Sequence, residues 1–124
     1  MIEFYRVGKD YHGRRVLRDV TFRVEKGEFV FLTGPSGAGK STLLKMLFRA
    51  ETPSDGQILV NGMNVAAMPQ HRVPELRRSM GIVFQDYKLL PSRTVFENVA
   101  FVLKFLGVPH AERKRRAYQM LRLV

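Results

Sequence analysis

Residues 34–42 are the part of the sequence best suited to chemistry. Gly34 to Ser41 fill the pattern G-x-x-x-x-G-K-[ST] at every position. The glycines permit a tight turn in which successive N–H groups converge on phosphate oxygens. Lys40 supplies a cation for the outer phosphates, and Ser41 offers a hydroxyl to Mg²⁺. The predicted nucleotide-binding residues of this loop are Gly34, Pro35, Ser36, Gly37, Ala38, Gly39, Lys40, Ser41 and Thr42.

The segments on either side of the loop support this interpretation. The apolar residues 29–33 precede it and predict a central strand, and residues 43–48 predict a helix whose N-terminal dipole favours anions. A chance match in a glycine-containing turn is the alternative, and it does not require these flanks. The order of strand, phosphate loop and helix is therefore the predicted framework of a nucleotide site.

Composition and charge limit the class of protein. The chain has 124 residues, 45% of them apolar and 26% charged, which is typical of one globular domain. It contains no cysteine, and its three histidines are scattered, so the sequence predicts neither a disulfide framework nor a zinc site. The net charge of +10 favours an anionic partner without choosing among nucleotide, nucleic acid and membrane.

The densest cationic run is residues 113–116, Arg-Lys-Arg-Arg. Such a run can form a nucleic-acid patch or the solvated face of a helix. No aromatic residue interleaves it as a stacking platform for bases would require. The solvated helix face is therefore preferred.

The first half of the chain predicts an antiparallel β layer. A strand is expected over Ile2 to Val7 and a turn over residues 9–13. The alternation of residues 20–24 predicts a second strand. Residues 57–60 followed by Asn61-Gly62 predict a two-residue hairpin.

The second half predicts mainly helices. A short helix is expected over residues 73–78, and residues 81–85 predict a second buried strand. Thr94 and Glu97 fit a capping box, and Gly107 supplies the stop, so a helix is expected over residues 94–106. Its apolar segment, residues 99–103, is too short to span a membrane and predicts a buried helix. Another helix begins near residue 110.

Taken together, these motifs resemble the N-terminal part of ATP-binding cassette (ABC) ATPases, and most closely their cell-division subgroup. The resemblance covers the whole chain and is strongest at Arg77-Arg78, at residues 81–86, and at Arg93-Thr94-Val95 with residues 97–100. The lipoprotein-release and macrolide-export subgroups are alternatives. The implied fold is α/β, a partial P-loop NTPase in which an antiparallel β layer and the first core elements occupy residues 1–85. Residues 86–124 would begin the helical subdomain.

The resemblance also implies roles for single residues, with ATP and Mg²⁺ as cofactors. Tyr11 would stack on adenine with Val16 beside it, although an exposed Tyr at a strand end is the plainer alternative. Gln85 would contact Mg²⁺ or the attacking water, so Lys40 and Gln85 are the candidate catalytic residues and Ser41 and Gln85 the candidate metal ligands. Gln85 could instead be a polar strand end, or Asp86 could hold the metal at the end of a degenerate strand.

Partners follow from the resemblance as well. Leu89-Leu90 would dock an integral membrane subunit at the cytoplasmic face of the inner membrane, unless both leucines pack inward. The complete protein would form an ATP-bound homodimer, and nucleic acid is not an expected partner. A repair-type nucleic-acid ATPase, a non-catalytic binding module and a GTPase or nucleotide kinase are the competing functions.

The chain contains no Leu-Ser-Gly-Gly signature segment, no apolar strand ending in Asp-Glu and no later switch histidine. These groups normally anchor the metal and activate water. We therefore expect the chain to correspond to about the first half of an ATPase, and to bind nucleotide without efficient hydrolysis.

Overall fold

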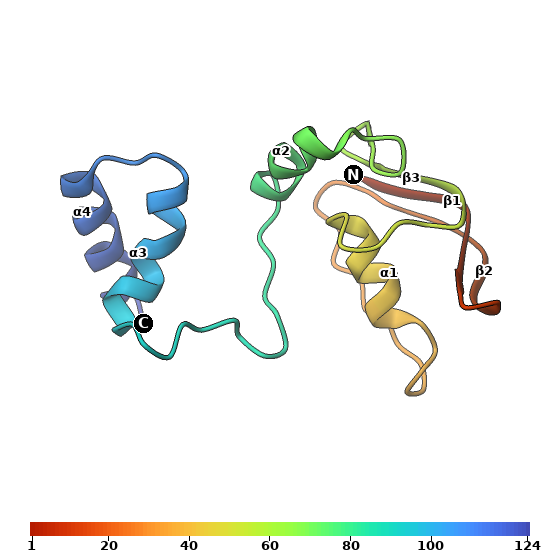
Figure 1. The fold of residues 1–124 in the computed structure, drawn as a ribbon, viewed down its shortest axis with the longest axis horizontal. Coiled ribbons are helices and arrows are strands. Elements are labelled where there is room, and N and C mark those ends of the chain that lie inside the picture. Colours follow the sequence, from red (N-terminus) through yellow and green to blue (C-terminus); the bar gives the residue numbers. More distant parts are fainter. The chain divides into compact units, whose positions relative to one another are not determined.

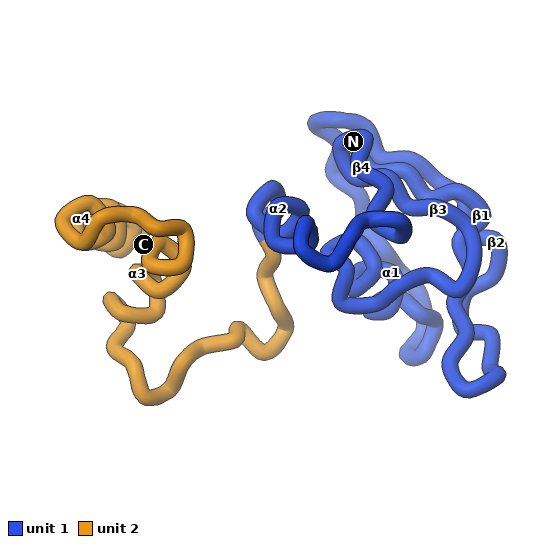
Figure 2. The backbone as a smooth tube through the Cα atoms, turned by 45° about the horizontal axis from the view of Figure 1, so that its top comes forward, with its two compact units in different colours: residues 1–81 blue, residues 82–124 orange.

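The computed structural model describes all 124 residues. The chain divides into two compact units, Met1–Gly81 and Ile82–Val124 (Figure 2). The first unit contains strands β1 (Ile2–Tyr11), β2 (Arg14–Val24), β3 (Asp55–Val60) and β4 (Met63–Asn64), helices α1 (Lys40–Leu47) and α2 (Val73–Arg78), and a 3₁₀ turn (Gln70–Arg72) (Figure 1). The second unit contains α3 (Val95–Phe105) and α4 (His110–Leu121).

The strands form one antiparallel sheet in the order β2-β1-β3-β4. Phe4 of β1 lies opposite Phe22 of β2 and Ile58 of β3, so β1 is paired on both sides. The predicted hairpin is confirmed, because Asn61 and Gly62 adopt φ values of 48° and 78° and join β3 to β4. Two successive positive φ angles are the geometry that matches the twist of a two-residue hairpin.

A single hydrophobic core joins α1 and α2 to this sheet. Met46 of α1, Ile58 of β3 and Leu76 of α2 are fully buried, and the rings of Phe4 and Phe22 stack with centroids 4.5 Å apart. The buried core residues are Phe4, Val7, Leu17, Leu43, Met46, Ile58, Val60, Val65, Met68, Val73 and Leu76. Because Leu43 and Met46 are both buried in this cluster, α1 is held in the core from its middle to its last turn.

The first strand is longer than expected. β1 continues past Val7 to Tyr11, and only His12 and Gly13 form the turn that was expected over residues 9–13. The reason is that β1 keeps pairing with β2 through irregular positions after Val7, until Tyr11 lies opposite Arg14. Tyr11 is therefore the last residue of a paired strand and not part of a loop.

Two predicted core strands are not formed in this structure. Residues 29–33 and 81–85 have no strand partner, and the apolar side chains of Phe29 and Val83 are 83% and 93% exposed. An apolar central strand is stable when neighbours on both sides satisfy its backbone N–H and C=O groups. Strands β1 to β4 pair only with one another, so neither segment has such a neighbour.

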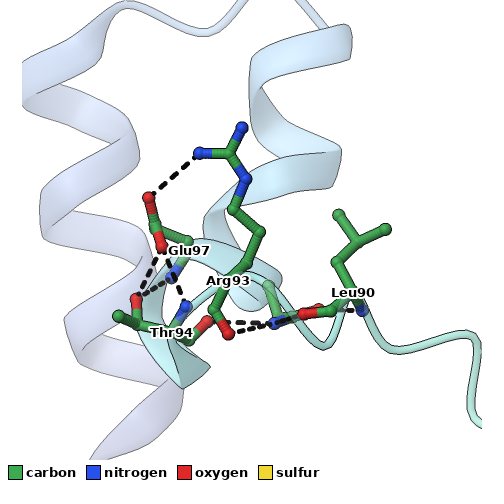
Figure 3. Close-up of polar contacts among 5 residues, drawn as sticks. Leu90, Arg93, Thr94 and Glu97 are labelled. Carbon is green, nitrogen blue, oxygen red and sulfur yellow. Dashed lines mark hydrogen bonds and ion pairs between the residues drawn. The ribbon is translucent and has the colours of Figure 1, made fainter.

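The second unit is a pair of helices. The predicted capping box of α3 is confirmed: the Thr94 side chain accepts from the Glu97 N–H at 3.1 Å, and the Glu97 carboxylate accepts from the Thr94 N–H at 2.8 Å (Figure 3). The prediction that α3 is buried was wrong, because none of its residues is buried. It packs against α4, for example through the rings of Phe96 and Tyr118, whose centroids lie 5.0 Å apart. None of the helices in the chain is long and apolar enough to cross a bilayer.

The capping box makes the stability of α3 dependent on pH. Hydrogen bonds from the backbone and side chain of Thr94, and one from Arg93, hold the pKa of Glu97 below its ordinary value of 4.5. A lowered folded-state pKa contributes stability above the ordinary pKa, and this stability is lost as the pH falls through the lowered value. We expect amide hydrogen exchange in α3, measured by NMR, to accelerate between pH 6 and pH 3 beyond the intrinsic pH dependence of exchange.

The variant Glu97→Gln is the matched control, because its amide oxygen can still accept from the Thr94 N–H but does not titrate. Its α3 amides should lack the extra acceleration that the wild-type helix shows at low pH. Equal pH profiles for the two proteins would contradict the assignment.

Candidate nucleotide-binding site

The phosphate-loop sequence forms a turn that ends at the start of α1. Gly39 is the N-cap of α1 with φ 90° and ψ 5°, a left-handed conformation that favours glycine. No side chain caps this helix, and no acidic residue lies in its first turn. Its first N–H groups therefore have no intrahelical or side-chain acceptor, and the positive end of the helix dipole is available to an anion.

Gly39 also lets the loop approach the sheet closely. A Cβ atom at Gly39 would lie 2.6 Å from Leu17 Cδ2 and 3.3 Å from Val16 Cγ1, both on β2. Leu17 is buried in the core, so it has little room to move. The glycine therefore brings the start of α1 into contact with the second strand.

Lys40 lies over the loop that precedes it. Its Nζ donates to the carbonyl oxygens of Gly34 and Pro35, each at 2.8 Å, and the Ala38 N–H donates to the Pro35 carbonyl at 3.3 Å. The ammonium thus bridges the beginning and end of the loop. Phosphate oxygens can take the place of these carbonyls, because an ammonium group bonds an ionised acceptor more strongly than a neutral one.

An open concavity of about 270 Å³ lies beside the loop. Tyr11 at the end of β1 and Val16 on β2 border it, opposite hydroxyl and backbone groups of the loop and of α1. Its lining residues are Tyr11, Val16, Ser36, Gly37, Gly39, Lys40, Ser41 and Thr42. An aromatic ring, a cation and a free helix N-terminus in one concavity are the groups that a nucleoside phosphate requires.

The other predicted site residues lie elsewhere. Gly34, Pro35 and Ala38 belong to the same loop but do not line the concavity. Gln85 lies in the second unit, where it is exposed and begins a turn over residues 85–88 and does not end a strand. The neighbouring Asp86 forms an ion pair with Lys88, which lowers the pKa of Asp86.

The chain has no group of three or more His, Cys, Asp or Glu side chains that could hold a metal ion by themselves. The exposed Ser41 hydroxyl in the concavity is suited to Mg²⁺ in another way. Mg²⁺ bound with a nucleotide takes most of its ligands from phosphate oxygens and water and needs only one or two protein oxygens. The donor set therefore fits a metal that arrives with the nucleotide.

Two residues of structural interest were missed from the sequence. Lys9 is buried, and its Nζ lies 4.7 Å from the centroid of the Tyr11 ring. Asn98 exchanges hydrogen bonds with the backbone of Leu90: its Oδ1 accepts from the N–H at 2.8 Å, and its Nδ2 donates to the carbonyl at 3.1 Å. The contact between Lys9 and Tyr11 could have been predicted from their spacing, because residues i and i+2 of a strand share one face. No such spacing rule links Asn98 to Leu90.

Asn98 fixes the segment in which a partner-binding surface was expected. Besides Leu90, its Nδ2 donates to the carbonyls of Arg93 and Thr94 at 3.2 and 3.0 Å. One amide side chain therefore ties the loop before α3 to the first turn of that helix. Leu89, next to the fixed Leu90, remains 67% exposed.

The basic run lies on α4. Glu112 accepts from Arg115 and Arg116, and these hydrogen bonds lower the pKa of Glu112 to about 2. Two of the four cations are thus paired within the helix, and Lys114, Arg115 and Arg116 are exposed. This arrangement is typical of a solvated helix face.

The uncapped helix, the glycine loop and the lysine together define a phosphate-loop nucleotide-binding fold. Comparison with known proteins narrows the class further: the chain belongs to the ABC transporter family, whose model matches residues 17–124. Several relatives carry the name cell division ATP-binding protein FtsE. The one from Bacillus subtilis is 47% identical over 100% of this chain and 55% of its own length. The one from Escherichia coli K12 is 47% identical over 94% of this chain and 53% of its own length.

Solved structures of ABC cassettes have a fold similar to that of this chain. The dimeric structure of MJ0796, a bacterial ABC transporter cassette, matches with a TM-score of 0.87 and 32% identity over 98% of this chain and 56% of that chain. A dimeric post-hydrolysis state of the same cassette, bound to ADP and Pi, matches with a TM-score of 0.87 and 31% identity. The fold is therefore a partial P-loop NTPase of the ABC type. The chain spans about half the length of the curated relatives it matches.

Close packing at Gly39 leads to a prediction. In Gly39→Ala the new Cβ meets both an unfavourable positive φ and the buried Leu17 side chain, so we expect the free energy of unfolding to fall by about 2–4 kcal/mol. Urea denaturation measures this change. Gly37→Ala is the matched control, because Gly37 has φ 80° but nothing within 4 Å of its Cβ position. If the two variants lose the same stability, the contact with Leu17 has no energetic role.

Proposed function

We propose that this chain binds ATP with Mg²⁺ at the concavity beside α1. The observation that carries the proposal is that Tyr11 and the phosphate-loop residues border one concavity. Tyr11 precedes these loop residues by about 25 positions in the chain. Adenine would stack on Tyr11 with Val16 beside it, and the phosphates would lie on the loop at the helix N-terminus. Lys40 would leave the Gly34 and Pro35 carbonyls and bind the outer phosphates.

Ser41 is the residue proposed to hold Mg²⁺ in the first unit. Gln85 belongs to the second unit and stays a candidate ligand from the family resemblance alone. The ion, when bound, would neutralise charge on the phosphate oxygens. The protein groups contribute binding and orientation: the loop N–H groups and Lys40 hold the phosphates, and the Tyr11 ring holds the base.

The complete protein is proposed to be an ATPase. Membership of the ABC family and the FtsE relatives support ATP hydrolysis in cell division. The groups that activate water are not found among these 124 residues, so hydrolysis would need residues beyond them. We therefore propose that this chain alone binds ATP and hydrolyses it poorly.

The partner is proposed to be an integral membrane subunit of the FtsX type, with this protein peripheral on the cytoplasmic face of the membrane. The exposed Leu89 beside the fixed Leu90 supports a docking surface there. The dimeric cassettes to which the chain is similar support an ATP-bound homodimer of the complete protein. The FtsE names favour this assignment over the lipoprotein-release, macrolide-export and nucleic-acid repair subgroups.

Calorimetric titration of ATP and GTP in the presence of Mg²⁺ tests the nucleotide site. We expect ATP to bind more tightly than GTP. Tyr11→Ala should weaken ATP binding by about tenfold through the loss of base stacking. Lys40→Ala should weaken ATP binding by about tenfold or more, because a hydrogen bond between charged groups is lost.

The exposed lysine Lys26 offers a charge-matched control, and Lys26→Ala should leave ATP affinity unchanged. Absence of ATP binding would overturn the proposed function. Equal ATP and GTP affinities that do not respond to Tyr11→Ala would overturn the adenine assignment alone.

The docking surface is tested by co-purification of the complete protein with its membrane subunit from detergent-solubilised membranes. Leu89→Asp should reduce recovery of the complex about tenfold, because it places a charge in an apolar contact. Leu123 is the control position: it is 76% exposed but lies after α4. Equal recovery with Leu89→Asp and Leu123→Asp would contradict the proposed surface.

A further inference from the structure

Lys9 is the only charged residue buried in this protein, with 8% of its surface exposed. Its Nζ forms an ion pair with Glu51 Oε2 at 3.0 Å and donates to the Thr52 carbonyl at 2.7 Å. A buried ammonium is costly unless it is paired and hydrogen-bonded, and both conditions hold here. The side chain is therefore fixed at its charged end.

The same ammonium lies over the ring of Tyr11, 4.7 Å from the centroid. Tyr11 borders the nucleotide concavity, but Lys9 does not line it. Lys9 covers one face of the ring, so a base that stacks on Tyr11 has to use the opposite face. A cation over an aromatic ring also attracts it electrostatically and restricts its rotation.

Lys9 connects this ring to the helix that carries the phosphate loop. The N–H groups of Ala50 and Glu51 both donate to the Lys45 carbonyl near the end of α1, at 2.9 and 3.3 Å. The ion pair with Glu51 thus links β1, which carries Tyr11, to α1, which begins at Lys40. The distance between a base and its phosphates in a nucleotide has to match the separation between the Tyr11 ring and the phosphate loop.

We propose that Lys9 is a positioning residue that holds the Tyr11 ring, from the face opposite the base, at the correct distance from the phosphate loop for an adenine nucleotide. This inference rests on the proposed function. Lys9 does not touch the nucleotide and acts through Tyr11. With the ring held in place before binding, less conformational freedom is lost when ATP binds.

The test is a double-mutant cycle on ATP affinity, measured by calorimetry with Mg²⁺. Lys9→Met keeps the length of the side chain and removes the charge, and it should weaken ATP binding by about fivefold. In a Tyr11→Ala background the same substitution should have no further effect, because the ring through which Lys9 acts is absent. Lys9→Arg retains the cation and should restore most of the affinity.

Lys26→Met is the control for loss of one positive charge, since Lys26 is exposed in a turn of the same unit. Far-UV circular dichroism of each variant confirms that it is folded. The inference is overturned if Lys9→Met binds ATP as the wild type does. It is also overturned if Lys9→Met lowers ATP affinity by the same factor in the Tyr11→Ala background as in the wild type. Those outcomes leave the proposed function intact, whereas a wild-type chain that binds no ATP overturns both.

Discussion

The packing of α1 against the antiparallel sheet is the constraint on which the rest of the first unit depends. Leu43 and Met46 enter the core shared with the strands, and Gly39 lets the preceding turn contact Val16 and Leu17. Burial of apolar side chains supplies the driving force, and the missing Cβ of Gly39 supplies the space. Because of this contact the helix N-terminus lies beside the first hairpin, and the proposed nucleotide would contact both.

Two lysine side chains near the concavity are held by hydrogen bonds. The charged end of Lys9 is held by Glu51 and by the Thr52 carbonyl, and Lys40 is held by two carbonyls of its own loop. The difference between the two lysines is informative. Lys9 is buried and bonded to groups outside the concavity, whereas Lys40 lines the concavity and bonds to groups that an anion can replace. One lysine is thus suited to holding the site and the other to binding the ligand.

The second unit depends on local hydrogen bonds more than on a core. Thr94 and Glu97 cap α3, and Asn98 ties the preceding loop to the helix through the backbone of Leu90. Neither α3 nor most of α4 is buried, so short-range polar contacts define where the helix begins and where Leu89 is presented. Apolar side chains therefore remain exposed beside a fixed backbone, as the proposed docking surface requires.

The sequence by itself determined the features that arise from local physical chemistry. The glycine turn that leads into α1, the hairpin at Asn61-Gly62 and the capping box at Thr94 were all predicted, because glycine, turn and capping preferences act over a few residues. The ABC family was also evident from motifs in the chain. The interpretation of Tyr11 as a base-stacking residue remains a prediction.

Only the tertiary structure decided features that depend on partners distant in the chain. Residues 29–33 and 81–85 are apolar enough for core strands, yet they form none here because no neighbouring strand pairs with them. The apolar segment of α3 is exposed for a similar reason, since burial requires a second surface. The role of Lys9 likewise became visible only when folding brought Glu51 and Tyr11 to its ammonium group. Pairing, burial and long-range ion pairs are properties of the folded chain, and sequence periodicity indicates only that a segment is able to adopt them.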